Sequence, residues 1–230
     1  MFISIPSREK APLRWATPLL FTALWVCFIG SALLPDPEQR RLMMDWGTLS
    51  GGLGEPADWW RSIRGGTALR LVTALFLHAD WAHLLGNLVF LLIFGLPSER
   101  AMGPWRFLLL FLVGGAVANV AAVLSIGTPD RVIIGASGAI SAVIGAYLAL
   151  FPTAKLGVVL PLGLFLEFVK APASLLIGIW ALLQVVFAYT GPAFGAVAWW
   201  AHIAGFLFGV VFALFVRAAI ARRMRKRQGY

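Results

Sequence analysis

Four side chains from three separate segments of this 230-residue chain have the chemistry of a hydrolytic site. Ser137 lies at the expected start of an apolar helix, and its hydroxyl could act as a nucleophile. His202 could act as the base that removes the proton from that hydroxyl. His83 and Asn87 are four residues apart on one helix face, where they could donate hydrogen bonds to an oxyanion. We therefore expect a Ser–His dyad with an oxyanion hole.

Glycines flank the candidate nucleophile in the segment Gly135-Ala-Ser137-Gly138. A helix that begins here presents unpaired backbone N–H groups and a partial positive charge, so the Ser137 N–H is a third candidate oxyanion donor. Gly135 and Gly138 would allow a substrate backbone to approach closely. The segment alone is equally typical of a serine that caps a helix between flexible residues. Each histidine alone could likewise serve only as a hydrogen-bonding group between helices.

Two faces of small residues predict how the serine and the histidine meet. One face lies on the helix after Ser137 and the other on the helix that carries His202. Their members are Ser137, Ser141 and Gly145, and Gly205, Gly209 and Ala213. Such faces allow helix backbones to approach closely in lipid. If the two faces pack together, Ser137 and His202 come together near one membrane surface.

The composition places these helices in a membrane. Apolar residues make up 60% of the chain and charged residues 13%, and the mean hydropathy is +0.85. These values exclude a disordered chain, a nucleic-acid-binding domain and a disulfide scaffold, and the single cysteine agrees with the last exclusion. The net charge of +9 is concentrated beside apolar segments, which favours contact with the lipid bilayer and no nucleic acid.

The apolar segments predict an all-α membrane protein with six transmembrane helices and a long outward first loop, about 35 to 70. The predicted spans are approximately 15–34, 82–96, 105–126, 137–151, 172–190 and 197–216. The second and fourth spans are too short to cross the hydrocarbon core, so we expect their first residues to meet water below the membrane surface. The segment 156–168 is expected at the interface, and the alternative is a seventh span.

Charge distribution predicts the orientation. Basic residues before the first span and after the last one favour cytoplasmic termini, with the site toward the outer face. The expected divisions are a cytoplasmic N-terminal segment 1–14, a catalytic domain 15–216 and a basic cytoplasmic tail 217–230. We expect a multi-pass protein of the cell (inner) membrane.

In these motifs the chain resembles the rhomboid intramembrane serine proteases. The matching segments are His83-Leu-Leu-Gly-Asn87, Gly135-Ala-Ser137-Gly138 and the run from Ala201-His202 to Gly209, in the order of the family. The resemblance implies that Ser137 is the nucleophile, that His202 is the base and that His83, Asn87 and the Ser137 N–H hold the oxyanion. It also implies that the substrates are transmembrane segments of single-pass or polytopic membrane proteins, and that no cofactor or metal is needed.

The chain departs from the family pattern in two places. The family often has Trp-Arg before the second span, where this chain has Leu69-Arg70, with Trp60-Arg61 as another candidate. Some members place an aromatic ring four residues after the nucleophile, against the catalytic histidine. Here that residue is Ser141, so something else must orient His202.

Two other functions are alternatives to the protease, and one segment is a candidate gate. A non-catalytic rhomboid-like protein that binds client helices would be expected to lose the serine or the histidine, and both are present. A transporter predicts a polar path through the membrane, whereas the polar residues here lie toward one side. The fifth span with the loop 191–195 is a candidate gate for substrates or an ordinary turn.

Overall fold

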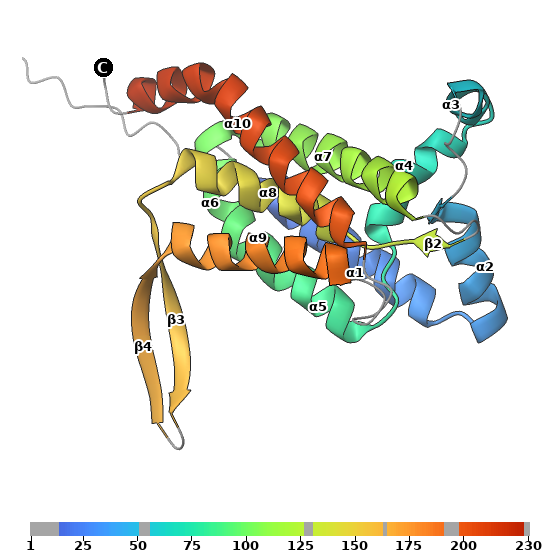
Figure 1. Ribbon diagram of the computed structural model, residues 1–230, viewed down its shortest axis with the longest axis horizontal. Coiled ribbons are helices and arrows are strands. Elements are labelled where there is room, and N and C mark those ends of the chain that lie inside the picture. The colour runs from blue at the N-terminus through green and yellow to red at the C-terminus, as the bar shows by residue number, and fades with distance from the viewer. Residues whose placement is uncertain (1–13, 51–55, 127–130, 163–164, 191–197, 228–230) are drawn as a thin grey trace, which may run out of the picture.

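The computed structural model describes residues 14–50, 56–126, 131–162, 165–190 and 198–227. Within these ranges a bundle of helices carries two small antiparallel sheets (Figure 1). The α-helices are α1 (Ala16–Ala32), α2 (Asp36–Trp46), α3 (Pro56–Arg64), α4 (Arg70–Thr73), α5 (Trp81–Phe90), α6 (Leu96–Met102), α7 (Pro104–Ser125), α8 (Ser137–Leu150), α9 (Ala173–Thr190) and α10 (Trp199–Arg227). Shorter turns are η1 (Thr67–Leu69), η2 (Ala74–Phe76) and η3 (Leu91–Gly95), and the strands are β1 (Thr48–Leu49), β2 (Val132–Ile133), β3 (Lys155–Leu162) and β4 (Phe165–Pro172).

The apolar helices confirm the predicted all-α membrane fold. In the part of the chain that the structure describes, four helical segments are long and apolar enough to cross a membrane: Trp81–Met102, Pro104–Ser125, Ala173–Thr190 and Trp199–Ile220. The helices α1, with 17 residues, and α8, with 14, are apolar but shorter. The six predicted spans correspond to these four segments together with α1 and α8. Within the predicted first loop, the described residues include the helices α2 and α3.

The second span is longer than the sequence predicts. Its helix continues through the π-helical turn η3 into α6, so that the segment Trp81–Met102 has 22 residues. Pro97 lacks an N–H and its ring crowds the preceding turn, and a wider π turn directly before the proline relieves that conflict. The predicted end near residue 96 is therefore wrong. Of the two spans that were predicted to be short, the second and the fourth, only the fourth (α8) is short in the structure.

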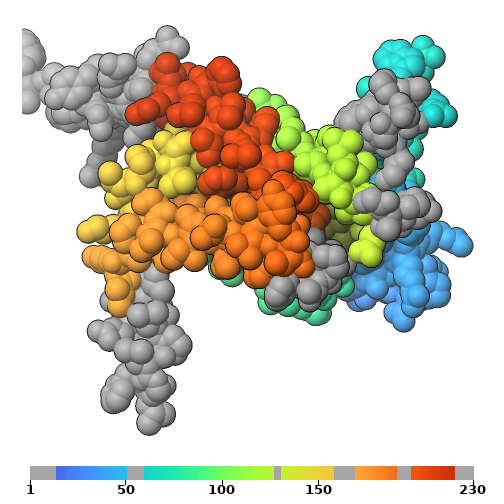
Figure 2. Space-filling view, in the orientation of Figure 1, coloured from blue at the N-terminus to red at the C-terminus, as the bar shows by residue number. Residues whose placement is uncertain are grey.

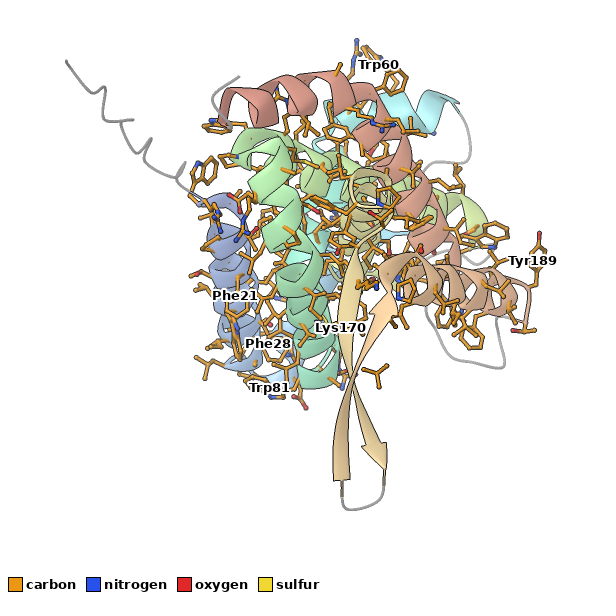
Figure 3. The ribbon with its side chains drawn as sticks, turned by 90° about the vertical axis from the view of Figure 1, so that its left-hand side faces the viewer. Phe21, Phe28, Trp60, Trp81, Lys170 and Tyr189 are labelled. Atoms are coloured by element: carbon orange, nitrogen blue, oxygen red, sulfur yellow. The ribbon has the colours of Figure 1, made fainter. Side chains whose placement is uncertain are left out.

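A buried carboxylate explains why the second span continues past that proline. Glu99 on α6 is only 1% exposed, and its two carboxylate oxygens accept the backbone N–H groups of Ala16 and Thr17, each at 2.9 Å. These N–H groups begin α1, where a helix favours negative charge. At the other end of α1, the Phe28 ring packs against Trp81 with 4.7 Å between ring centroids (Figure 3). The helix α1 is thus attached at both of its ends to the segment Trp81–Met102.

The helix α8 lies at the centre of the bundle, and its most extensive contacts are with α10 and then α7 (Figure 1). Backbones of α8 and α10 are so close that an added Cβ at Gly205 would overlap the Gly138 carbonyl oxygen. An added Cβ at Gly209 would overlap the carbonyl oxygen of Ala142, and one at Gly145 would overlap that of Phe206. Small residues therefore set the separation of these two helices, as expected of close packing in lipid.

Backbone pairing attaches the first loop to the segment that precedes α8. Strand β1 pairs antiparallel with β2, and Thr48 lies opposite Ile133. Next to this pair, the Ser50 N–H donates to the Arg131 carbonyl at 2.9 Å, and the Arg131 N–H donates to Ser50 Oγ at 2.9 Å. The chain therefore enters α8 from a defined position.

The segment between α8 and α9 is a β-hairpin. Strands β3 and β4 pair from Lys155 opposite Pro172 to Leu162 opposite Phe165, and the hairpin projects away from the helices (Figure 1). The Ala173 N–H donates to the Ala154 carbonyl at 2.8 Å, so the chain returns to the place from which it left. The alternative of a seventh span across 156–168 is therefore wrong. The interfacial location of this segment stays a prediction.

The last helix extends beyond the predicted limit of the membrane domain. Helix α10 is continuous from Trp199 to Arg227, so the expected boundary at residue 216 falls inside one helix. In the space-filling view, α9 and α10 together cover one face of the bundle (Figure 2).

Replacing Gly209 by Ala should destabilise the protein, because the added methyl group meets a backbone carbonyl of α8 and the helices must separate. We expect a loss of about 1–3 kcal/mol, measured as a lower thermal unfolding temperature in detergent. Gly178→Ala on α9 is the matched control, because no atom lies within 4 Å of its added Cβ. That control should keep or raise the unfolding temperature, since alanine is the better helix former. Equal temperatures for the two variants would contradict the close approach.

Candidate active site

Ser137 and His202 are in direct contact although 65 residues separate them. Ser137 Oγ lies 2.9 Å from His202 Nε2, and both side chains are partly buried. Ser137 is the first residue of α8, and His202 lies in the first turn of α10. The glycine contacts described above bring these two helix ends together. The arrangement is a hydroxyl beside a potential base, which is the minimum needed to activate a serine.

The turn before Ser137 requires a glycine. Gly135 has φ +113°, a conformation that residues with a side chain rarely adopt, and its N–H donates to the Ala74 carbonyl at 2.9 Å. An added Cβ here would meet the His83 ring, with 2.5 Å to Nε2. Gly135 therefore allows His83 to lie directly against the backbone that leads into α8.

Gly138 and Ser141 have packing contacts in the structure. An added Cβ at Gly138 would meet Ala118 of α7 at 2.5 Å, so this glycine allows α7 and α8 to pack closely. The Ser141 hydroxyl donates to the Ser137 carbonyl at 2.7 Å within α8. A substrate contact at Gly138 stays a prediction. In the structure this glycine lies against α7.

His83 is held at the start of α5 by an N-cap. Asp80 Oδ1 accepts the His83 backbone N–H at 2.8 Å, which stabilises the first turn of the helix. The side chain of His83 extends from this turn toward Gly135 and lies 5.0 Å from the His78 ring, measured between centroids. The imidazole of His83 therefore lies beside the residues that precede Ser137.

Asn87 is paired with a histidine that the sequence-based site did not include. Asn87 Nδ2 lies 2.9 Å from His78 Nε2, and both side chains are buried. Burial, followed by the nearby His83, lowers the pKa of His78 from 6.5 to about 4. His78 is therefore neutral at neutral pH, and its Nε2 can accept a hydrogen bond from the Asn87 amide. An amide group carries two N–H donors, so this bond fixes Asn87 and leaves its second N–H available.

One cavity of about 340 Å³ contains the four predicted polar side chains. Its lining residues come from α5, α8, α9 and α10, and they are Ala82, His83, Gly86, Asn87, Phe90, Ser137, Ile140, Ser141, Ile144, Trp180, Gln184, Trp199 and His202. The structure thus brings His83 and Asn87 to the cavity on which Ser137 and His202 open. Its predominantly apolar wall with few polar groups is typical of a ligand-binding cavity.

Sequence reasoning missed Gln184, which contacts the other nitrogen of the histidine. Gln184 Oε1 lies 2.7 Å from His202 Nδ1. An isolated amide side chain in the middle of the apolar helix α9 is the signal that could have revealed it, because polar groups there are costly. The loop 191–195, which was a candidate gate together with this helix, lies outside the described residues.

The described residues contain no group of three or more His, Cys, Asp or Glu side chains that could hold a metal ion.

Comparisons with known proteins point to one family. A family model for the Rhomboid domain matches residues 59–219. The chain is 36% identical to the rhomboid protein YdcA of Bacillus subtilis over 91 residues, which is 40% of this chain and 41% of that protein. It is 34% identical over 92 residues to RHOMBOID-like protein 6, mitochondrial, of Arabidopsis thaliana, which is 40% of this chain and 29% of that protein. It is 33% identical to the rhomboid protease GluP of Bacillus subtilis over 106 residues, 46% of this chain and 18% of that protein. Each match spans less than half of the relative.

The buried His78 should make stability depend on pH. The unfolded chain binds a proton to this histidine below pH 6.5, whereas the folded chain does so only near pH 4. Stability should therefore fall as the pH drops through that window, by up to roughly 3 kcal/mol from this group. His78→Gln keeps an acceptor for Asn87 but does not titrate, so its unfolding free energy should fall less steeply. Chemical unfolding in detergent at several pH values measures the difference, and parallel curves would contradict the assignment.

Proposed function

The chain belongs to the rhomboid family, and on that premise we propose that it is an intramembrane serine endopeptidase with Ser137 as nucleophile and His202 as base. The observation that carries this proposal is the 2.9 Å separation between Ser137 Oγ and His202 Nε2 inside a cavity. The family and the apolar helices indicate a multi-pass membrane protein. The proposed substrates are membrane-spanning segments of other proteins.

In the proposed reaction, Ser137 Oγ attacks the carbonyl carbon of the scissile peptide while His202 Nε2 takes the hydroxyl proton. The resulting imidazolium gives this proton to the departing amine as the C–N bond breaks, and an acyl-enzyme remains. A water molecule then transfers a proton to His202 and attacks the ester. The ester bond breaks, the proton returns to Ser137 Oγ, and a carboxylic acid product leaves.

The negative charge of each tetrahedral intermediate needs donors on the side opposite the base. We assign this task to the second amide N–H of Asn87, an N–H of the His83 ring and the backbone N–H of Ser137. The first two line the same cavity as Ser137, and the third lies at a helix N-terminus, where a partial positive charge favours an anion. The His78 bond supports the role of Asn87 because it restricts rotation of the amide.

The proposed orientation puts the site toward the outer face of the cell membrane and both termini in the cytoplasm. His202 lies near the start of α10, and the basic cluster that begins at Arg217 lies 15 residues later on the same helix. This separation corresponds to about 22 Å along a helix, so the site and the basic cluster are near opposite ends of the bundle. Since basic residues favour the cytoplasmic side, the Ser–His pair faces outward in this proposal.

Ser137→Ala and His202→Ala should each abolish cleavage of a tagged single-pass substrate in liposomes, because one removes the nucleophile and the other the base. A fluorophosphonate probe should label the wild-type protein and fail to label the Ser137 variant. Ser125→Ala, at the end of α7 and outside the cavity, is the matched control and should remain active. Wild-type protein that folds but neither cleaves nor reacts with the probe would instead favour a non-catalytic protein that binds client helices.

Asn87→Ala should slow turnover by about 10²–10³ fold if its amide is a principal oxyanion donor. Asn119→Ala is the matched control, because Asn119 is another buried asparagine and it lies outside the cavity. Its amide donates to the Leu71 backbone carbonyl at 2.8 Å. Both variants should lose stability, and only the first should lose kcat. An Asn87 variant with the turnover of the Asn119 variant would make Asn87 a packing residue.

A further inference from the structure

The side chain of Gln184 is buried and points toward the histidine of the candidate site. It lies on α9, whose other buried residues are Ala173 and Ile177. Only 6% of Gln184 is exposed, although most of α9 is apolar and exposed. Since an unpaired amide in such a place is costly, its hydrogen bonds determine how it lies.

Two contacts define which way the Gln184 amide is turned. Gln184 Nε2 donates to the Trp180 carbonyl at 3.3 Å, within α9, and Oε1 lies 2.7 Å from His202 Nδ1. In the reverse orientation, the amide oxygen of Gln184 would face the carbonyl oxygen of Trp180. Both oxygens are acceptors, so no hydrogen bond could form between them. Gln184 Oε1 therefore accepts a hydrogen bond from His202 Nδ1.

This bond determines the tautomer of the histidine. A neutral imidazole carries one proton, and with that proton on Nδ1 the lone pair is on Nε2. Nε2 is the nitrogen that lies 2.9 Å from Ser137 Oγ. The neutral His202 is thus set to accept the hydroxyl proton and not to donate to the serine.

We propose that Gln184 is the positioning residue of the Ser137–His202 pair. It completes a Ser–His–Gln triad in which the amide oxygen orients the imidazole and stabilises its charged form. This inference rests on the proposed function and deepens it. Ser141 occupies the place where an aromatic ring could support the imidazole, so the Gln184 bond supplies an orienting contact from α9 instead. The Trp199 ring lies near His202, at 5.9 Å between ring centroids.

Among the residues that the structure describes, the groups that face His202 include no acid. They are Ser137 from α8, Gln184 from α9 and Trp199 from α10, and the other titratable residue of the cavity lining is His83 from α5. When His202 takes the serine proton, the resulting positive charge therefore meets an amide dipole at Nδ1 and no carboxylate. A neutral partner provides weaker stabilisation of an imidazolium than a charged one.

The Gln184 contact comes from the most loosely packed long helix. Of the four long apolar segments, α9 is the least buried, and a second cavity of about 230 Å³ lies between α9 and α10 beside the pair. In Figure 2, α9 is seen along the outside of the bundle. Orientation of His202 therefore depends on a mostly exposed helix, whose main described contacts are with α10, α8 and β4.

Three variants of the full-length protein test this proposal. Gln184→Leu removes the acceptor at similar size, and Gln184→Glu keeps an acceptor and adds a charge. Ile177→Ala is the matched control, because it loosens the same buried face of α9 two turns away without touching His202. Each variant is measured for kcat, KM, thermal unfolding and the rate of fluorophosphonate labelling between pH 5 and pH 9.

Gln184→Leu should lower kcat and the labelling rate about 10-fold with little change in KM, as expected from the loss of one hydrogen bond. Gln184→Glu should retain activity, and the acid limb of its labelling rate should move to higher pH by about one unit, since a carboxylate favours the imidazolium. Ile177→Ala should lower the unfolding temperature and leave the pH profile unchanged.

The result that overturns the proposal is a Gln184→Leu protein that labels at the wild-type rate, or a Gln184→Glu protein with the wild-type pH profile. An Ile177 variant that reproduces the loss of the Leu variant would also overturn it, because the effect would then come from packing. If the wild-type protein fails to label, the proposed function fails as a whole. Labelling of wild type that is insensitive to Gln184 removes only the positioning role.

Discussion

The close backbone contact between α8 and α10 is the constraint on which the candidate site depends. Gly205 lies against the Gly138 carbonyl and Gly209 against that of Ala142, so neither helix can move toward the other or accept a side chain between them. Because His202 lies one turn before Gly205, this contact also determines where its imidazole reaches α8. A hydrogen bond tolerates a change of only a few tenths of an ångström, and rigid packing provides that accuracy better than a loop.

Buried polar groups position the other elements around this helix pair. The Glu99 carboxylate fixes the start of α1, His78 fixes the Asn87 amide, and Asn119 bonds the backbone at Leu71. Each of these contacts joins segments that lie apart in the sequence or joins a loop to the helix that follows it. In an apolar interior, where packing alone permits helices to slide, such directed bonds select one register.

Sequence patterns predicted the parts of the structure that depend on local composition. The apolar segments predicted the helices, and the spacing of small residues predicted the faces that bring Ser137 and His202 together. Patterns failed where tertiary contacts override composition. A proline and a charged residue, Pro97 and Glu99, are typical of the end of a span. The helix continues here because a π turn precedes Pro97 and because Glu99 accepts hydrogen bonds from the start of α1. The β3–β4 hairpin was missed because its strands pair with each other and their apolar composition fits several structures. Gln184 was missed because its partner is 18 residues away and no pattern of small residues on α9 predicts which face of that helix packs against α10.

The distance along the chain between Ser137 and His202 has a consequence for biosynthesis. During synthesis, α8 leaves the ribosome before the β3–β4 hairpin and α9, and α10 follows them. The serine therefore enters the lipid without an imidazole beside it, and Gln184 arrives before the ring that it contacts. A nascent chain halted before residue 202 contains the hydroxyl but neither the base nor the glycines that hold the base nearby. In the proposed mechanism, the Ser137–His202 pair therefore cannot form until α10 has been synthesised and has packed against α8.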